Sequence, residues 1–201
     1  MSIYQFLPPQ NLLFNHSSYV WQENIFSDNE LNQIEKIGDG LNFDDGFAAD
    51  ENNEINSKPN VRKCKVGWIK RNNETEFIYE KIGSFVSWAN SYYFDFDLFG
   101  FTEDFQYTIY DGNESHYGWH LDIPSAGNFQ YRKLSLVLQL SNPVNYEGGE
   151  LEIFTSSSPT TLRKQRGIVH LFPSYILHRV TPVTSGIRKT MVVWTTGKRF
   201  K

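Results

Sequence analysis

The second half of the chain is a series of short β-rich segments separated by turn residues, and this pattern limits the possible folds most strongly. We predict strands at Phe105–Tyr110, Leu134–Leu140, Glu150–Thr155, Thr160–Lys164, Ile168–Phe172, His178–Val183 and Lys189–Thr196. Many short strands at near-even spacing are typical of a β-sandwich or barrel. We therefore expect a mainly β fold with flanking helices.

The first half of the chain predicts fewer and longer elements. Ser27 and Glu30 have the spacing of a capping box, and apolar residues follow at helical intervals, so a helix is expected to run to about Ile37. A second helix is expected over Glu74–Tyr92, where apolar residues recur every three or four positions. Val66–Ile69 is expected to be a short strand, and the polar residues 41–60 an exposed loop.

The length of 201 residues suits one domain with a sizeable core, and no internal repeat or linker interrupts the sequence. We predict a single domain over residues 1–201, with a helical buttress at about 1–104 and a β core at about 105–201. The net charge of −4 argues against an electrostatic nucleic-acid binder, so no nucleic-acid partner is expected.

The location of the protein is predicted from three features of the sequence. No apolar run approaches the roughly 18 residues that a membrane-spanning helix needs, so no membrane partner is expected. Residues Met1 to Gln10 lack the basic and apolar pattern of a secretory signal. Cys64 is the single cysteine, which rules out an internal disulfide and fits a reducing compartment. We therefore expect a cytoplasmic protein.

The β half contains a pair of metal-binding residue types two positions apart, His120 and Asp122, and a further histidine, His178. Residues i and i+2 of an extended segment point to the same side, so His120 and Asp122 can reach one ion. Two imidazoles and one carboxylate on one face of a metal form the site of non-haem iron(II) oxygenases. The His-x-Asp pair alone is equally compatible with a surface turn.

A basic residue, Arg188, follows His178 by ten positions, beyond Pro182 and Gly186. That distance allows a hairpin turn and a return along the next strand, where the guanidinium could meet a carboxylate through two hydrogen bonds. Tyr110 could donate a phenolic hydrogen bond to the same anion. Thr190 shares the face of Arg188 if that strand is regular. An isolated arginine in a β protein is more often a solvated surface residue.

Several blocks of the β half resemble one known family. The segments Leu134–Pro143 and Tyr146–Leu151, then Phe172–Ser174 and Leu177–Thr184, are similar to the prolyl-4-hydroxylase-like branch of the 2-oxoglutarate/iron oxygenases. The resemblance is closest to the bacterial PKHD-type hydroxylases. It covers about residues 105–197, it is weak over the first hundred residues, and its motifs occur in the family's order.

The resemblance implies a double-stranded β-helix, which is a cupin-like jelly roll, and a 2-oxoglutarate-dependent dioxygenase activity. It implies that His120, Asp122 and His178 bind Fe(II), and that Arg188 pairs with the distal carboxylate of 2-oxoglutarate, with Tyr110 and Thr190 at the same end. Ascorbate is expected to support the activity. The family places Tyr nine and Gly six residues before the first histidine ligand, but this chain has Asp111 and Glu114 there, which makes Tyr110 a less direct match.

The substrate follows from the resemblance alone. Hydroxylation of an unactivated C–H bond is expected, with dioxygen as oxidant and a prolyl or other amino-acid residue in a peptide or protein as substrate. Trp119, Leu136 and Trp194 would line the substrate pocket, although each is also compatible with core packing. Substrate loops are expected at Asp44–Pro59 and Ile123–Tyr131.

Three alternatives stay open. The same fold and metal site could act on a small-molecule metabolite, or the jelly roll could bind metal without catalysis. Halogenation by the same enzyme class is disfavoured, because such enzymes need the carboxylate position vacant for a halide and Asp122 is present.

Overall fold

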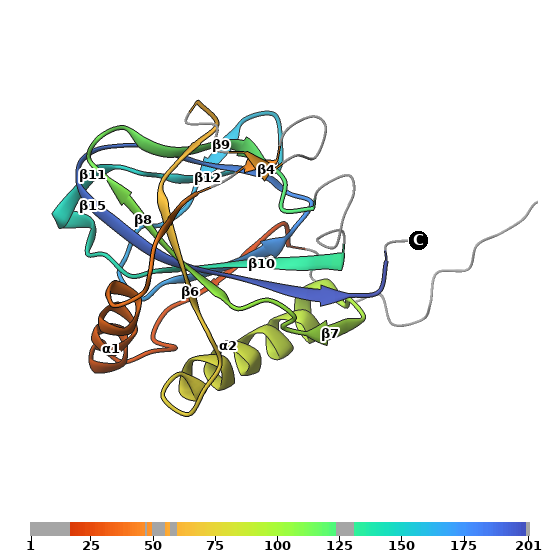
Figure 1. Cartoon of the computed structure of the whole chain (residues 1–201). Helices are drawn as coiled ribbons and strands as arrows, with labels where there is room; N and C mark the ends of the chain where they lie inside the picture. Colours follow the sequence, from red (N-terminus) through yellow and green to blue (C-terminus); the bar gives the residue numbers. More distant parts are fainter. Residues whose placement is uncertain (1–16, 47, 50–54, 57–59, 124–130, 200–201) are drawn as a thin grey trace, which may run out of the picture.

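The computed structural model describes residues 17–46, 48–49, 55–56, 60–123 and 131–199 (Figure 1). The elements before the β half are β1 (Val20–Gln22), α1 (Asp28–Asp39), β2 (Asp44–Asp45), β3 (Ala48–Ala49), β4 (Ile55–Asn56), β5 (Arg62–Lys63), β6 (Lys65–Ile69), α2 (Glu76–Ala89), η1 (Asn90–Phe94) and β7 (Leu98–Gly100). Those of the β half are β8 (Phe105–Asp111), β9 (Ser115–His120), β10 (Arg132–Gln139), η3 (Pro143–Asn145), β11 (Tyr146–Gly148), β12 (Leu151–Phe154), β13 (Pro159–Thr161), β14 (Val169–Pro173) and β15 (Leu177–Gly197).

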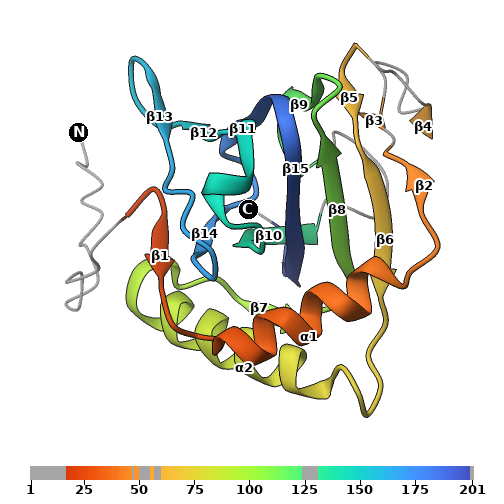
Figure 2. The ribbon, with the colours of Figure 1, turned by 90° about the vertical axis from the view of Figure 1, so that its left-hand side faces the viewer.

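The strands form two facing layers. The major layer has the order β1-β14-β10-β15-β8-β6-β2, and Figure 2 shows most of these strands in a row above the helices. In the second layer, β9, β11 and β12 pair with the first half of β15, while β5 pairs with β9 and β13 with β12. All of these pairings are antiparallel, and the predicted jelly roll with flanking helices is confirmed.

Helix α1 begins where the sequence predicts. The Ser27 side chain accepts from the Glu30 backbone N–H, and the Ser27 N–H donates to the Glu30 carboxylate at 2.8 Å, so the capping box is complete. Helix α2 covers Glu76–Ala89 of the predicted second helix, and the chain then continues into the π-helical turn η1. Both helices pack on the outer face of the major sheet through one apolar cluster, which includes Ile34, Ile82 and Leu136.

The predicted hairpin between His178 and Arg188 is wrong. Leu177–Gly197 is one strand of 21 residues that takes part in both layers. Its first half pairs with β9, β11 and β12, and its second half pairs with β8 and β10. Gly186 has φ of +73°, and a Cβ there would lie 2.0 Å from the Asn145 carbonyl oxygen. Only glycine allows the strand to pass so close at this backbone angle.

The rest of the strand prediction is confirmed in outline, but the short strands β1, β5, β7 and β11 were not predicted. Strand β9 was not predicted, because His116, Tyr117 and Gly118 give no strong alternation of polar and apolar residues. The predicted loop at 41–60 contains the short strands β2, β3 and β4. The two expected substrate loops lie partly outside the described residues, at 47, 50–54, 57–59 and 124–130.

Within the described residues, no helix is both long enough and apolar enough to cross a membrane.

Candidate metal and co-substrate site

The structure brings His120, Asp122 and His178 together between the two layers. His120 ends β9, Asp122 follows two residues later, and His178 lies directly opposite His120 at the start of β15. One potential ligand atom from each residue lies within 4.8 Å of the others. Nε2 of His120 is 3.6 Å from Oδ1 of Asp122, and Nε2 of His178 is 3.4 Å from its Oδ2.

Backbone carbonyls fix the orientation of both imidazoles. Nδ1 of His120 lies 2.8 Å from the Gly118 oxygen, and Nδ1 of His178 lies 2.8 Å from the Ile176 oxygen. A carbonyl only accepts, so each Nδ1 carries the proton and each Nε2 presents its lone pair to the centre of the group. Burial and the neighbouring His120 lower the pKa of His178 to about 4, which keeps this imidazole neutral and able to bind metal.

Asp122 completes the group as a buried carboxylate. Burial acts to raise its pKa, but His178, His120 and Arg132 outweigh burial and hold the pKa below its usual range. The Ser135 hydroxyl donates to its Oδ2 at 2.6 Å. Two neutral imidazole nitrogens and one ionised carboxylate are a donor set that suits Fe(II), with the remaining coordination positions open.

Arg188 lies in the second half of β15, directly opposite Tyr110 of β8. Its side chain is 2% exposed, and its Nε and Nη1 have no hydrogen-bond partner within the described part of the chain. The guanidinium carbon is 5.3 Å from the centre of the Tyr110 ring. Thr190, two residues further along the same strand, is 1% exposed. A buried cation with free donors needs an anion, so these atoms provide a place for a carboxylate.

Sequence reasoning missed Tyr146, which lies beside Arg188. Tyr146 is 4% exposed, and its hydroxyl accepts from Nε2 of Gln139 at 3.0 Å. Burial raises the pKa of the Tyr146 phenol, while the charge of Arg188 and a hydrogen bond with it work against that rise. The Gly-Gly block next to Tyr146 has a packing role. A Cβ at Gly149 would lie 2.8 Å from Cδ of Arg188, so glycine leaves the room that the arginine occupies.

One antiparallel ribbon therefore carries both parts of the site. Residues 105–120 run beside residues 178–192, with His120 opposite His178 and Tyr110 opposite Arg188. Gly112 lets the two strands approach where β15 passes from one layer to the other, since a Cβ at Gly112 would be 2.9 Å from Cα of Ser185. The register of the ribbon therefore sets the separation between the His120–His178 pair and the Tyr110–Arg188 pair.

The three residues predicted for the substrate pocket differ in their positions. Trp194 has the strand parity of Arg188 and is 6% exposed, and Nε1 of its indole ring has no partner within the described residues. Leu136 belongs to the cluster that faces the helices, so it points away from the site. Trp119 packs against Phe154 and Arg179 on the outer face of the second layer. The structure does not bring Leu136 and Trp119 to the metal-binding group, because each is the strand neighbour of a residue that faces inward, Ser135 and His120.

Two further side chains lie against the metal-binding group. The Tyr117 ring stacks on the His120 imidazole, with ring centres 3.4 Å apart. Burial raises the pKa of Tyr117 to about 12, so its hydroxyl remains protonated. Arg132 pairs with Glu103 through both carboxylate oxygens, stacks 3.7 Å from the Trp194 ring centre, and lies 3.4 Å from the Asp122 carbonyl oxygen. Sequence reasoning gave neither residue a role in substrate binding.

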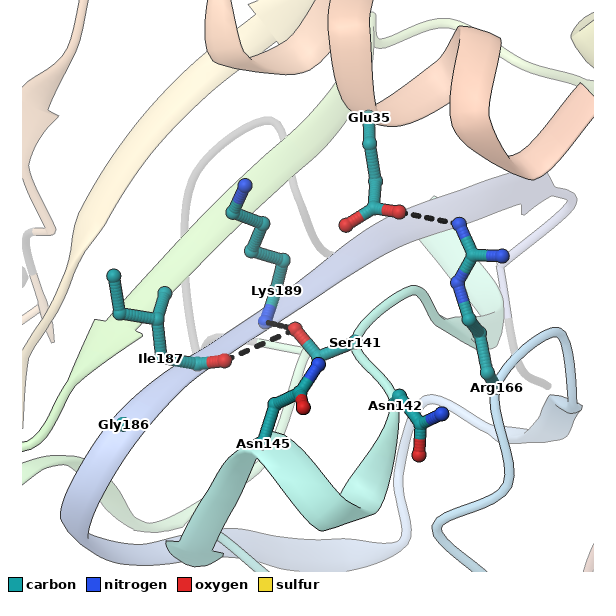
Figure 3. A pocket seen from close by; sticks show the side chains of 8 residues that line it. All are labelled: Glu35, Ser141, Asn142, Asn145, Arg166, Gly186, Ile187 and Lys189. Carbon is teal, nitrogen blue, oxygen red and sulfur yellow. Dashed lines mark hydrogen bonds and ion pairs between the residues drawn. The ribbon is translucent and has the colours of Figure 1, made fainter.

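A separate cavity of about 590 Å³ lies near the bend of β15 (Figure 3). Its lining includes Ser141, whose hydroxyl donates to the Ile187 carbonyl at 3.1 Å and accepts from the Lys189 N–H at 2.7 Å. The two cations at its border are already balanced, because Arg166 pairs with Glu35 and Lys189 with Asp39. We assign no ligand to this cavity.

Comparison with known proteins agrees with this geometry. Residues 105–196 match the model of the 2OG-Fe(II) oxygenase superfamily, and the match contains every residue of the metal-binding group and Arg188. These residues are therefore similar to a 2OG-Fe(II) oxygenase domain. Within it, the chain is 44% identical over 86 residues to a PKHD-type hydroxylase of Hyphomonas neptunium, and 38% identical over 84 residues to one of Nitrosomonas eutropha. The matches cover 41% and 39% of this chain but only 38% and 37% of the relatives.

Solved structures share the fold of the oxygenase domain and of the helices. A prolyl hydroxylase of Trichoplax adhaerens, solved with a peptide fragment of a hypoxia inducible factor, superposes with a TM-score of 0.74 at 17% identity, over 90% of this chain and 84% of that one. A Pseudomonas putida prolyl-4-hydroxylase gives 0.69 at 16% identity, over 92% and 94%. A viral collagen prolyl hydroxylase of Paramecium Bursaria Chlorella virus-1 gives 0.68 at 21% identity, over 92% and 99%.

Proposed function

We propose that this protein is an Fe(II)- and 2-oxoglutarate-dependent dioxygenase that hydroxylates an unactivated C–H bond. One observation carries the proposal. The group His120, Asp122 and His178 and the guanidinium of Arg188, whose Nε and Nη1 have no partner within the described residues, lie along one ribbon of strands. Both border the same apolar cluster, which contains Tyr110 and Phe172, with Tyr117 packed against it. A metal site alone would suit many functions, but a metal site beside a buried anion site suits a metal and a dicarboxylate bound together.

The residues present fit the iron. Both Nε2 atoms present lone pairs, and the Asp122 carboxylate is ionised, so the three donors need no proton loss before they bind Fe(II). Bound there, iron would supply the activation of dioxygen that drives oxidative decarboxylation of 2-oxoglutarate to succinate and carbon dioxide. The protein contributes the orientation of the donors and a shielded interior.

The residues present also fit 2-oxoglutarate. Its distal carboxylate would accept hydrogen bonds from the Arg188 guanidinium, whose Nε and Nη1 are buried and have no partner in the described part of the chain. Burial raises the pKa of Tyr110, so its phenol remains protonated and able to donate to the same carboxylate. Thr190 would line the same end from the face of Arg188. These contacts would orient the co-substrate along the ribbon, with its other end toward the metal.

We further propose that the substrate lies against Tyr117, Arg132 and Trp194. Tyr117 stacks on His120, and Arg132, which lies beside the Asp122 carbonyl, stacks on Trp194. Flat aromatic faces and a fixed guanidinium would hold a small ring or an amide group. The preferred substrate is therefore a prolyl or other amino-acid residue in a peptide or protein. The prolyl hydroxylases among the structural neighbours support this choice, and a small-molecule metabolite is the alternative.

The single-domain organisation and the cellular location of the protein are also proposals. The apolar contacts that join α1 and α2 to the major sheet support one domain over the whole chain. The cytoplasmic location stays a prediction that rests on the sequence features given above, among them the single cysteine.

The test is a search for the hydroxylated product. The protein is incubated with Fe(II), 2-oxoglutarate, ascorbate and a library of peptides, free amino acids and metabolites, and products are screened by mass for one added oxygen atom. A prolyl-containing product whose formation requires 2-oxoglutarate supports the proposal. A product found only among amino acids and metabolites would replace the peptide substrate by a small molecule. Succinate release without iron, or tight metal binding with no turnover on any class, would refute the dioxygenase and leave a metal-binding module.

A further inference from the structure

Two fully buried serines lie behind Asp122. Ser135 of β10 and Ser174, which follows β14, are both 0% exposed. Ser135 Oγ is 2.6 Å from Oδ2 of Asp122, and Ser174 Oγ is 2.9 Å from Ser135 Oγ. Ser174 is also bound through its backbone, because its carbonyl accepts from the Asp122 N–H at 3.0 Å. The proposed reaction gives neither hydroxyl a role.

The direction of these hydrogen bonds follows from the chemistry of the groups. An ionised carboxylate only accepts, so Ser135 must donate its single hydroxyl proton to Asp122. Its oxygen can then only accept from its neighbour, so Ser174 donates to Ser135. The chain runs from Ser174 to Ser135 to Asp122, and each buried hydroxyl is satisfied only in this order.

The consequence concerns the two oxygens of the carboxylate. A carboxylate can bind a metal through one oxygen or through both. Oδ2 receives the short hydrogen bond from Ser135, which removes electron density from it and fixes the plane of the group. Within the described residues, Oδ1 accepts from no hydroxyl, and its neighbour is Nε2 of His120 at 3.6 Å.

We propose that the relay formed by Ser135 and Ser174 restricts Asp122 to a single ligand oxygen. Three protein donors then leave roughly three coordination positions for the co-substrate and dioxygen, whereas a chelating carboxylate would occupy one of them. Ser135 and Ser174 are positioning residues, which act on the metal through Asp122. This inference rests on the proposed metal site.

The experiment uses Mn(II) as a probe of the metal site and compares the full-length wild type with Ser135→Ala, Ser135→Thr and Ser174→Ala. Mn(II) affinity, the relaxation of water protons by the bound ion and calorimetric binding of 2-oxoglutarate are measured for each. Relaxation reports the number of metal-bound waters. Ser115→Ala is the matched control, since Ser115 is a buried serine that donates to another carboxylate, Asp111, at 2.8 Å.

We expect Ser135→Ala to keep or tighten Mn(II) binding while the relaxation enhancement falls by about one third, as one of roughly three waters is lost. Affinity for 2-oxoglutarate should fall about tenfold, because the position that it needs is occupied. Ser135→Thr keeps the hydroxyl and should match the wild type. Ser174→Ala keeps its backbone contacts. It should lower the relaxation enhancement and the 2-oxoglutarate affinity as Ser135→Ala does, but by a smaller amount. Ser115→Ala should leave all three unchanged.

Unchanged relaxation and unchanged 2-oxoglutarate affinity in a folded Ser135→Ala would overturn the inference, as would a parallel loss of Mn(II) binding, which indicates a purely structural role. If Ser135→Ala does not fold, Ser174→Ala decides by the same criteria. A wild type that binds neither Mn(II) nor 2-oxoglutarate instead refutes the proposed function itself, so the two failures are distinguishable.

Discussion

Replacing Arg188 by methionine should separate co-substrate binding from metal binding and from folding. Methionine has a similar length and no charge, and it can occupy the space beside Gly149 and the Tyr110 ring. The substitution removes Nε and Nη1, which are buried and have no partner among the described residues, and leaves His120, Asp122 and His178 untouched.

The magnitude follows from those two donors. A hydrogen bond to a charged group contributes about 1.5–3 kcal/mol, so losing the pair should weaken 2-oxoglutarate binding by about 3 kcal/mol, on the order of 100-fold. The stability of the metal-free protein should increase, although the affinity for 2-oxoglutarate falls. The metal-free wild type keeps a desolvated cation without an anion, so the Arg188→Met protein should be more stable by about 1–2 kcal/mol.

The assay is calorimetric titration of 2-oxoglutarate into Mn(II)-loaded protein, with Mn(II) affinity and thermal unfolding of the metal-free protein measured in parallel. Arg179→Met is the matched control, because Arg179 lies on the same strand but faces outward and pairs with Glu152 at 2.7 Å. It should leave both affinities unchanged. The reasoning is refuted if Arg188→Met keeps wild-type 2-oxoglutarate affinity, or if it loses Mn(II) binding or stability first.

Three further predictions concern the surroundings of Arg188. Gly149→Ala places a Cβ 2.8 Å from Cδ of Arg188 at a φ of +64°, so it should lower stability by about 1–3 kcal/mol and weaken 2-oxoglutarate binding, both measurable by unfolding and calorimetry. Tyr146→Phe should weaken 2-oxoglutarate binding several-fold without affecting Mn(II), and an unchanged affinity would exclude Tyr146 from that end of the site. Burial lowers the pKa of His170 from 6.5 to about 4, so the unfolded chain takes up a proton that the folded one refuses. The free energy of unfolding of the metal-free protein should therefore decrease as pH falls from about 6.5 to about 4, by up to about 3 kcal/mol from this residue. His170→Leu should show a weaker dependence of stability on pH. The same pH dependence in both proteins would contradict the lowered pKa of His170.

Much of the site could be predicted because side chains alternate between the two faces of a strand. The spacing of two residues in the sequence therefore indicates whether they share a face. His120 and Asp122 share a face at a spacing of two, and Thr190 and Trp194 share the parity of Arg188. The same rule excludes Trp119, which is adjacent to His120. The capping box at Ser27 located the start of α1, because its two hydrogen bonds are local and need no tertiary partner.

Strand β10 shows a signal that was present but missed. All of its residues are buried, so apolar content alone does not tell which face is which. Yet leucine occupies every second position, at 134, 136, 138 and 140, while Ser135 and Gln139 stand between. The leucine face packs on the helices, and the face with the polar residues turns to Asp122 and Tyr146.

The course of β15 could not be read from the sequence. Pro182 and Gly186 are typical turn residues, and they predict a hairpin when only the chain itself is considered. The structure uses Gly186 for close passage past Asn145 instead, so the strand bends and continues. That outcome depends on contacts with η3 and β11, which no local pattern of residues encodes.

The most direct test of the central claim is the formation of succinate from 2-oxoglutarate under air by Fe(II)-loaded protein. The wild type should release succinate in proportion to the 2-oxoglutarate consumed, and His178→Ala, which removes one of the three donors, should release none above the protein-free background. No succinate from an Fe(II)-loaded wild type, or equal amounts from wild type and His178→Ala, would contradict the assignment of this site as the centre of a 2-oxoglutarate-dependent dioxygenase.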